Sequence, residues 1–142
     1  NHNFKLIEGL EADDTIGIEA TRHPDPSNII VSPDKDMRQI PCVLWNMTDD
    51  VVEITEEEGD RWHLIQALSG DPTDGYSGCP GIGVKRATEL LNKNENQWEA
   101  VCKAYRDRGL SDDDALLNAR LAKILRNENY DHDRNQPILW NP

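Results

Sequence analysis

The 142-residue chain carries 27 acidic and 15 basic side chains, for a net charge of −12. This balance excludes a protein that binds nucleic acid by attraction over a broad basic surface. Cys42, Cys79 and Cys102 form no Cys-x-x-Cys pair and the histidines lack ligand spacing, so neither a disulfide framework nor a zinc site is predicted. Because no apolar run approaches the about 20 residues that cross a bilayer, we expect a cytoplasmic protein with no membrane partner.

The first half of the chain has the pattern of alternating helices and strands. Asp13 begins a predicted helix that ends before Pro24, and residues 28–32 form a continuous apolar run of strand length. Residues 41–45 and 51–54 are predicted to pair as two further strands around a polar turn. These elements indicate an α/β class.

The second half has helical spacing throughout. Thr55 and Glu58 match a capping box that opens a helix ending at Gly70. Ser111, followed by an acidic triplet, predicts the cap of a last helix that reaches Arg126. Apolar stripes predict three core-facing helices: Val84, Ala87 and Leu91; Trp98, Val101, Cys102 and Tyr105; Leu117, Leu121, Ile124 and Leu125. The tail from residue 127 is expected to be irregular, or docked through Ile138, Leu139 and Trp140.

Acidic residues gather in three short clusters. These are Glu11, Asp13 and Asp14; Asp34 and Asp36; and Asp71 and Asp74. The first two follow predicted strands, and ligands of open α/β sheets bind beyond the carboxyl ends of strands. Because gathered carboxylates repel one another, a divalent cation is the expected means of neutralising them. Taken alone, the first cluster is more often a helix start, and the third is compatible with simple turn formation.

The third cluster leads directly into a glycine-rich turn. Gly78, Gly81 and Gly83 allow close approach of the backbone to a ligand, and a basic helix begins at Val84-Lys85-Arg86. Since no strand leads into these glycines, a dinucleotide-binding Rossmann turn is excluded. Carboxylates, glycine turn and basic helix in this order predict a magnesium-dependent nuclease that holds a phosphodiester locally.

These motifs together resemble the flap endonuclease and 5′-to-3′ exonuclease family, particularly its phage members and the nuclease domains joined to bacterial DNA polymerases. Glu11–Asp14, Ser32–Met37, and Gly70–Gly75 followed by Pro80–Lys85 match three successive family motifs. The similarity runs from about Leu10 to Leu91. It implies the carboxy-terminal part of a PIN-like α/β nuclease core over residues 1–62, and a helical DNA-binding subdomain over 63–142.

The resemblance also implies roles for individual residues. Glu11 and Asp13, with Asp14 auxiliary, would belong to a first metal site, and Asp34, Asp36 and Asp74, with Asp71 supporting, to a second. These carboxylates would act through two Mg²⁺ ions, which Mn²⁺ can replace. The segment at about 68–92 would form a helix-three-turn-helix that holds DNA through Gly78, Gly81, Gly83, Val84, Lys85 and Arg86, and that can bind K⁺.

The family's substrates are duplex DNA with a 5′ end or flap, or RNA–DNA hybrids, in phage or bacterial replication and repair. A phage-encoded member would act in the host cytoplasm. The family's active site also uses an amino-terminal strand and a helical arch, which are not among these 142 residues. We therefore expect weak or no cleavage by this chain alone, unless that region is supplied by the same or another chain. The alternatives are a duplex-binding module or a subunit of a split nuclease, and a purely structural acidic protein.

Overall fold

A computed structural model describes residues 10–142 except residues 26 and 49. The chain divides into two compact units. Unit 1 takes the residues up to Gly59 together with Ile124–Leu139, and unit 2 takes Asp60–Lys123 together with Trp140–Pro142. Residues 124–139, which the sequence prediction kept with the helices, thus lie in the first unit.

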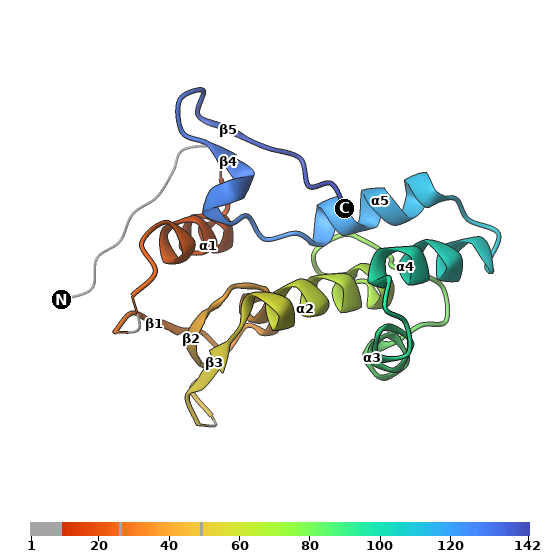
Figure 1. Ribbon diagram of the computed structural model, residues 1–142, viewed down its shortest axis with the longest axis horizontal. Coiled ribbons are helices and arrows are strands. Elements are labelled where there is room, and N and C mark those ends of the chain that lie inside the picture. Colours follow the sequence, from red (N-terminus) through yellow and green to blue (C-terminus); the bar gives the residue numbers. More distant parts are fainter. Residues whose placement is uncertain (1–9, 26, 49) are drawn as a thin grey trace. The chain divides into compact units, whose positions relative to one another are not determined.

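Unit 1 contains a small mixed sheet. Its strands β1 (Ile29–Val31), β2 (Cys42–Trp45) and β3 (Val52–Ile54) lie in the order β1-β2-β3 (Figure 1). Strand β1 is parallel to β2, with Ile30 opposite Leu44, and β2 is antiparallel to β3. All three strands were predicted from the sequence. The connection from β1 to β2 is the 3₁₀ helix η1 (Lys35–Gln39), which the sequence did not indicate.

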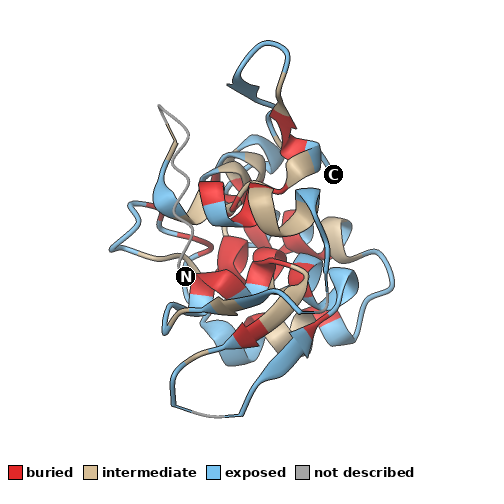
Figure 2. Cartoon of the chain, turned by 90° about the vertical axis from the view of Figure 1, so that its left-hand side faces the viewer, coloured by how far each residue is buried: buried red, intermediate tan, exposed pale blue. Residues whose placement is uncertain are grey.

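The remaining elements of unit 1 are one helix and the returning segment. Helix α1 (Ala12–Arg22) packs against the 3₁₀ helix η2 (Asn127–Asn129), which is followed by a short hairpin of β4 (Tyr130–Asp131) and β5 (Gln136–Pro137). The turn of this hairpin is exposed (Figure 2). The hairpin corrects the expectation of an irregular tail. A buried cluster holds unit 1 together: Met37, Ile40, Leu44, Ile54 and Ile124.

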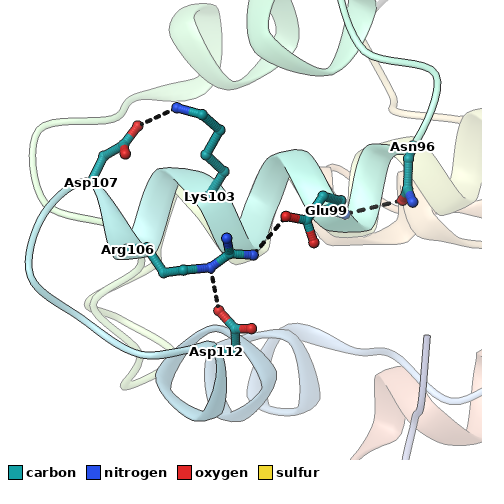
Figure 3. Close-up of polar contacts among 6 residues, drawn as sticks. All are labelled: Asn96, Glu99, Lys103, Arg106, Asp107 and Asp112. Carbon is teal, nitrogen blue, oxygen red and sulfur yellow. Dashed lines mark hydrogen bonds and ion pairs between the residues drawn. The ribbon is translucent and has the colours of Figure 1, made fainter.

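Unit 2 is built from helices. They are α2 (Glu56–Ser69), which starts in unit 1, α3 (Val84–Asn92), α4 (Gln97–Arg106) and α5 (Asp112–Ala122). The Thr55 hydroxyl accepts the Glu58 N–H at 3.1 Å, which is one half of the predicted capping box. Ser111 caps α5 as predicted and forms a capping box with Asp114. At the surface, the Arg106 guanidinium pairs with Glu99 on the same helix and joins α4 to the start of α5 through Asp112 (Figure 3).

The core of unit 2 contains most of the predicted stripes but not all of them. Leu91, Val101 and Tyr105 are buried, and the Tyr105 hydroxyl donates to the Ala67 carbonyl at 2.7 Å. Leu117 and Leu121 were expected in the core but are 56% and 54% exposed, and Val84 is also exposed. Helix α5 instead buries its small residues, because alanines let neighbouring helices approach closely; these are Ala115, Ala119 and Ala122.

Trp140 docks on the core of unit 2, and docking was one of the two alternatives that the sequence predicted for the tail. Its ring meets His63 and Trp98 edge-on, at centroid distances of 4.9 and 5.2 Å. His63 is buried and its Nε2 lies 2.7 Å from the Ala119 carbonyl, which makes it a packing residue. Ile138 and Leu139, by contrast, are exposed. Among the described residues, no helix combines the length and apolar character that a membrane span requires.

Candidate functional site

Two aspartates follow the carboxyl end of β1, where the sequence placed them. Asp34 is the N-cap of η1, and its Oδ1 accepts the Asp36 N–H at 2.9 Å. The Asp34 N–H in turn donates to the Ser32 hydroxyl at 3.2 Å. Met37, fully buried, anchors the short helix in the core of unit 1, and Asp36 is itself only 8% exposed. The loop after β1 therefore holds one exposed and one buried carboxylate in fixed positions.

Asp13 completes a group of three carboxylates in unit 1. It lies in the first turn of α1, and its carboxylate oxygen and one from each of Asp34 and Asp36 lie within 4.8 Å of one another. Hard oxygen donors at this spacing are the ligands that Mg²⁺ and Ca²⁺ take in proteins. These three residues, from two elements, thus form a donor set that fits a hard divalent cation.

Glu11 and Asp14, predicted beside Asp13, are placed differently. Glu11 is exposed at the N-cap of α1, so the helix begins at Ala12, one residue before the predicted start at Asp13. Asp14 is half-buried and its Oδ1 accepts the Leu125 N–H at 3.0 Å. Burial raises the pKa of the Asp14 carboxyl above its ordinary 3.8, the Leu125 N–H partly offsets this, and the Glu11 charge adds to it. Neither residue belongs to the group of three.

Asp71 and Asp74 lie in unit 2, in a tight turn after α2. The Asp71 carboxylate accepts the Thr73 N–H at 3.0 Å, and the Asp71 and Tyr76 backbones pair across the turn. Asp74 is exposed. This geometry is that of a simple turn, which the residue types of this cluster also allowed. Their predicted association with Asp34 and Asp36 stays a prediction.

The glycine turn that follows is held from inside by apolar side chains. Cys79 and Ile82 are buried in the core of unit 2, while Gly81 and Gly83 are exposed. Gly78, in contrast, is buried, and a Cβ there would lie 2.4 Å from the Gly70 nitrogen. Its backbone N–H donates to the Asn118 Oδ1 at 2.9 Å. Gly78 therefore serves packing, and the exposed backbone begins at Pro80.

Helix α3 starts from this turn without a side-chain cap. Its N-cap is Gly83, and its first turn carries Val84, Lys85 and Arg86, all exposed. The first backbone N–H groups of a helix have no acceptor within the helix, and they favour an anion. Two cationic side chains beside these N–H groups make this the part of unit 2 best suited to hold a phosphate.

Sequence reasoning missed the residues that hold these elements in place. Asn118 braces the glycine turn from α5, and the Arg108 guanidinium donates to the Pro80 carbonyl. In unit 1, Gln39 and Arg126 are both buried. The Gln39 side chain accepts the Ile124 N–H, and the Arg126 guanidinium donates to the Gln39 carbonyl. Gln39 lies beside the charged Arg38 in a mostly polar stretch, so the local sequence gives no signal that its side chain is buried.

Comparison with known proteins gives relatives over nearly the whole chain, although no family model matches it. The exodeoxyribonuclease of Enterobacteria phage T3 is 30% identical over 94% of this chain and 56% of its own length. The exonuclease of Escherichia phage T7 is 31% identical over the same shares. The 5′-3′ exonuclease of Mycobacterium tuberculosis is 33% identical over 61% of this chain and 34% of its own length. The chain thus spans little more than half the length of these phage proteins.

Proposed function

Because the chain belongs to the 5′-3′ exonuclease family, we propose that it carries part of a metal-dependent site for hydrolysing DNA phosphodiester bonds. The family itself is the one that the three sequence motifs predicted. The observation that carries the proposal is the convergence of Asp13, Asp34 and Asp36 in unit 1, with their carboxylate oxygens within 4.8 Å. The proposed substrates are DNA with a 5′ end or flap, or an RNA–DNA hybrid.

Mg²⁺ is the proposed cofactor, and Mn²⁺ can replace it. In a two-ion arrangement, such cations activate water and stabilise the charge that develops on phosphoryl oxygens. The protein's part is to hold the ligands. Asp36 is fixed by burial, and Asp34 by its own bond to the Asp36 N–H, so both carboxylates are in place before a cation binds. Ligand positions set in advance reduce the ordering cost of binding.

DNA is proposed to bind at the exposed start of α3. Gly81 and Gly83 expose their backbone there, and Lys85 and Arg86 supply local positive charge in a chain of net charge −12. Contacts of this kind go to the phosphates and are independent of sequence. We propose that this segment is the family's helix-three-turn-helix.

Calorimetric titration with Mn²⁺ tests the metal site. Asp34→Asn and Asp36→Asn each replace an anionic ligand by a neutral amide, and we expect each to weaken Mn²⁺ binding by at least about tenfold. Asp25→Asn is the matched control. This substitution removes the same charge from an exposed position in unit 1, and Asp25 lies outside the group of three. Equal affinities in all four proteins would refute the site.

A module that holds duplex DNA without cutting it is the second candidate. The observation in its favour is that the proposed DNA-binding segment belongs to unit 2, whereas Asp13, Asp34 and Asp36 belong to unit 1. Incubation with 5′-labelled duplex and flap DNA in Mg²⁺ or Mn²⁺ separates the two. Metal-dependent release of 5′ nucleotides, lost in Asp36→Asn, supports the nuclease. Binding without hydrolysis supports the module.

A further inference from the structure

The strap, as we call residues 124–127, consists of the extended residues 124–126, which follow the end of α5, and of Asn127, the first residue of η2. The backbone leaves the helix at Lys123, with φ −67° and ψ 123°, and is still extended at Arg126. The strap belongs to unit 1, and Ile124 packs in the core of that unit. It leads into the helical turn of η2 that packs against α1 (Figure 1).

One side of the strap is bonded to α1. The Leu125 N–H donates to the Asp14 Oδ1 at 3.0 Å, and the Asn127 N–H donates to the Thr21 hydroxyl at 2.7 Å. Between these two bonds, Gly17 lies so close to the strap that a Cβ there would meet the Leu125 carbonyl oxygen at 2.2 Å. Helix α1 is therefore fixed to the strap at two points more than one turn apart, with close packing between them.

The other side of the strap is bonded to η1. The Ile124 N–H donates to the Gln39 Oε1 at 2.9 Å, and the Arg126 guanidinium donates to the Gln39 carbonyl at 2.8 Å. Alternate residues of an extended segment face opposite sides, which is why 125 and 127 reach α1 while 124 and 126 reach η1. Gln39 is 1% and Arg126 4% exposed. Breaking one of these bonds would remove a buried hydrogen bond, at a cost in stability.

The elements that the strap joins are the two that carry the proposed metal ligands. Asp13 precedes Asp14 on α1, and Asp34 and Asp36 precede Gln39 on η1. We propose, on the basis of the proposed metal site, that the strap sets the spacing of these ligands and that Asp14 is a positioning residue and not a ligand. Adjacent residues of a helix point about 100° apart, so Asp13 faces the other carboxylates while Asp14 faces the strap.

Two substitutions of Asp14 separate the two roles. Asp14→Asn keeps an oxygen that accepts the Leu125 N–H but removes the charge, whereas Asp14→Ala removes both. We expect Asp14→Asn to bind Mn²⁺ within about threefold of wild type and Asp14→Ala to bind about tenfold more weakly, as is found when groups behind a metal ligand are lost. The measurement is calorimetric, on folded protein, with thermal stability recorded separately without metal. A purely structural role would lower that stability and leave the affinity unchanged.

Thr21 supplies a second pair of variants that does not depend on how well Asp14→Ala folds. Thr21→Ser keeps the hydroxyl that accepts the Asn127 N–H, and Thr21→Val keeps the shape without it. We expect only Thr21→Val to weaken Mn²⁺ binding, by about threefold. Equal affinities of the Ser and Val variants, an Asp14→Ala protein that binds like wild type, or equal losses in Asp14→Asn and Asp14→Ala would each overturn the positioning role.

Asp13→Asn is the reference that separates this inference from the proposed function. If Asp13 is a ligand, its loss weakens Mn²⁺ binding whatever the strap does. Unchanged binding in Asp13→Asn would therefore refute the metal site itself. A loss in Asp13→Asn together with no effect of the strap variants would refute only the positioning role.

Discussion

Gly78 and Gly81 share a left-handed backbone, with φ of 67° and 76°, but differ in their surroundings. Gly81 faces open space, and nothing lies within 4 Å of the position that a Cβ would take. Gly78 is enclosed, because the Leu68 carbonyl oxygen and the Gly70 backbone lie within 2.7 Å of that position. Glycine is therefore required at position 78 both by the dihedral angle and by packing, and at position 81 by the dihedral angle alone.

Alanine at each position measures these two requirements separately. Gly81→Ala is expected to lower the free energy of unfolding by about 1–2 kcal/mol, the cost of a left-handed residue with a Cβ. Gly78→Ala should cost about 1–3 kcal/mol more, because the backbone of Gly70 must also move. Urea denaturation of both variants checks this. Equal losses would contradict the close packing around Gly78.

At the scale of elements, α5 carries two large apolar residues that face away from the core of unit 2. Leu117 and Leu121 are exposed, whereas Leu91 on α3 is 1% exposed and packs in the core of unit 2. Leu91→Ala is expected to lower the free energy of unfolding by about 2–5 kcal/mol, and Leu117→Ala by no more than about 0.5 kcal/mol. Denaturation followed by tryptophan fluorescence measures both. A large loss in Leu117→Ala would show that this face of α5 is covered.

Elements with local signals were the predictable ones. The starts of α2 and α5 follow from Thr55 and Ser111, whose side chains cap backbone N–H groups three residues away. The end of α5 does not follow from local signals. The periodic pattern continues to Leu125, but Ile124 leaves the helix because its side chain and its N–H find partners in unit 1. Periodicity counts apolar residues and contains no information about which partner they meet.

The same distinction applies to the candidate site. The positions of Asp34 and Asp36 were predictable, because lying just beyond the carboxyl end of a strand is a local property. The Asp14–Leu125 bond joins residues 111 apart and the Arg126–Gln39 bond residues 87 apart, so no sequence spacing indicates them. The resemblance implies an auxiliary place for Asp14 at the first metal site, whereas its carboxylate accepts a hydrogen bond from the strap in the structure.

At the scale of the whole molecule, the net charge of −12 opposes DNA at long range. Any affinity for duplex DNA must therefore come from a few local contacts, and each cation that neutralises a phosphate contributes about one unit to the slope of log affinity against log salt. The cationic side chains at the start of α3, Lys85 and Arg86, are the proposed contacts. The wild-type slope is accordingly expected to be small.

Lys85→Ala is expected to weaken duplex binding equally across sequences and to flatten the salt slope by about one unit. Lys103→Ala is the matched control, because the Lys103 ammonium is already paired with Asp107 at 2.9 Å on α4 (Figure 3). Removing Lys103 changes the net charge equally without removing the proposed phosphate contact, so its slope should remain that of wild type. Fluorescence anisotropy of labelled duplex over a salt series measures both slopes. If the two variants flatten the slope to the same extent, the effect comes from overall charge, and Lys85 makes no phosphate contact of its own.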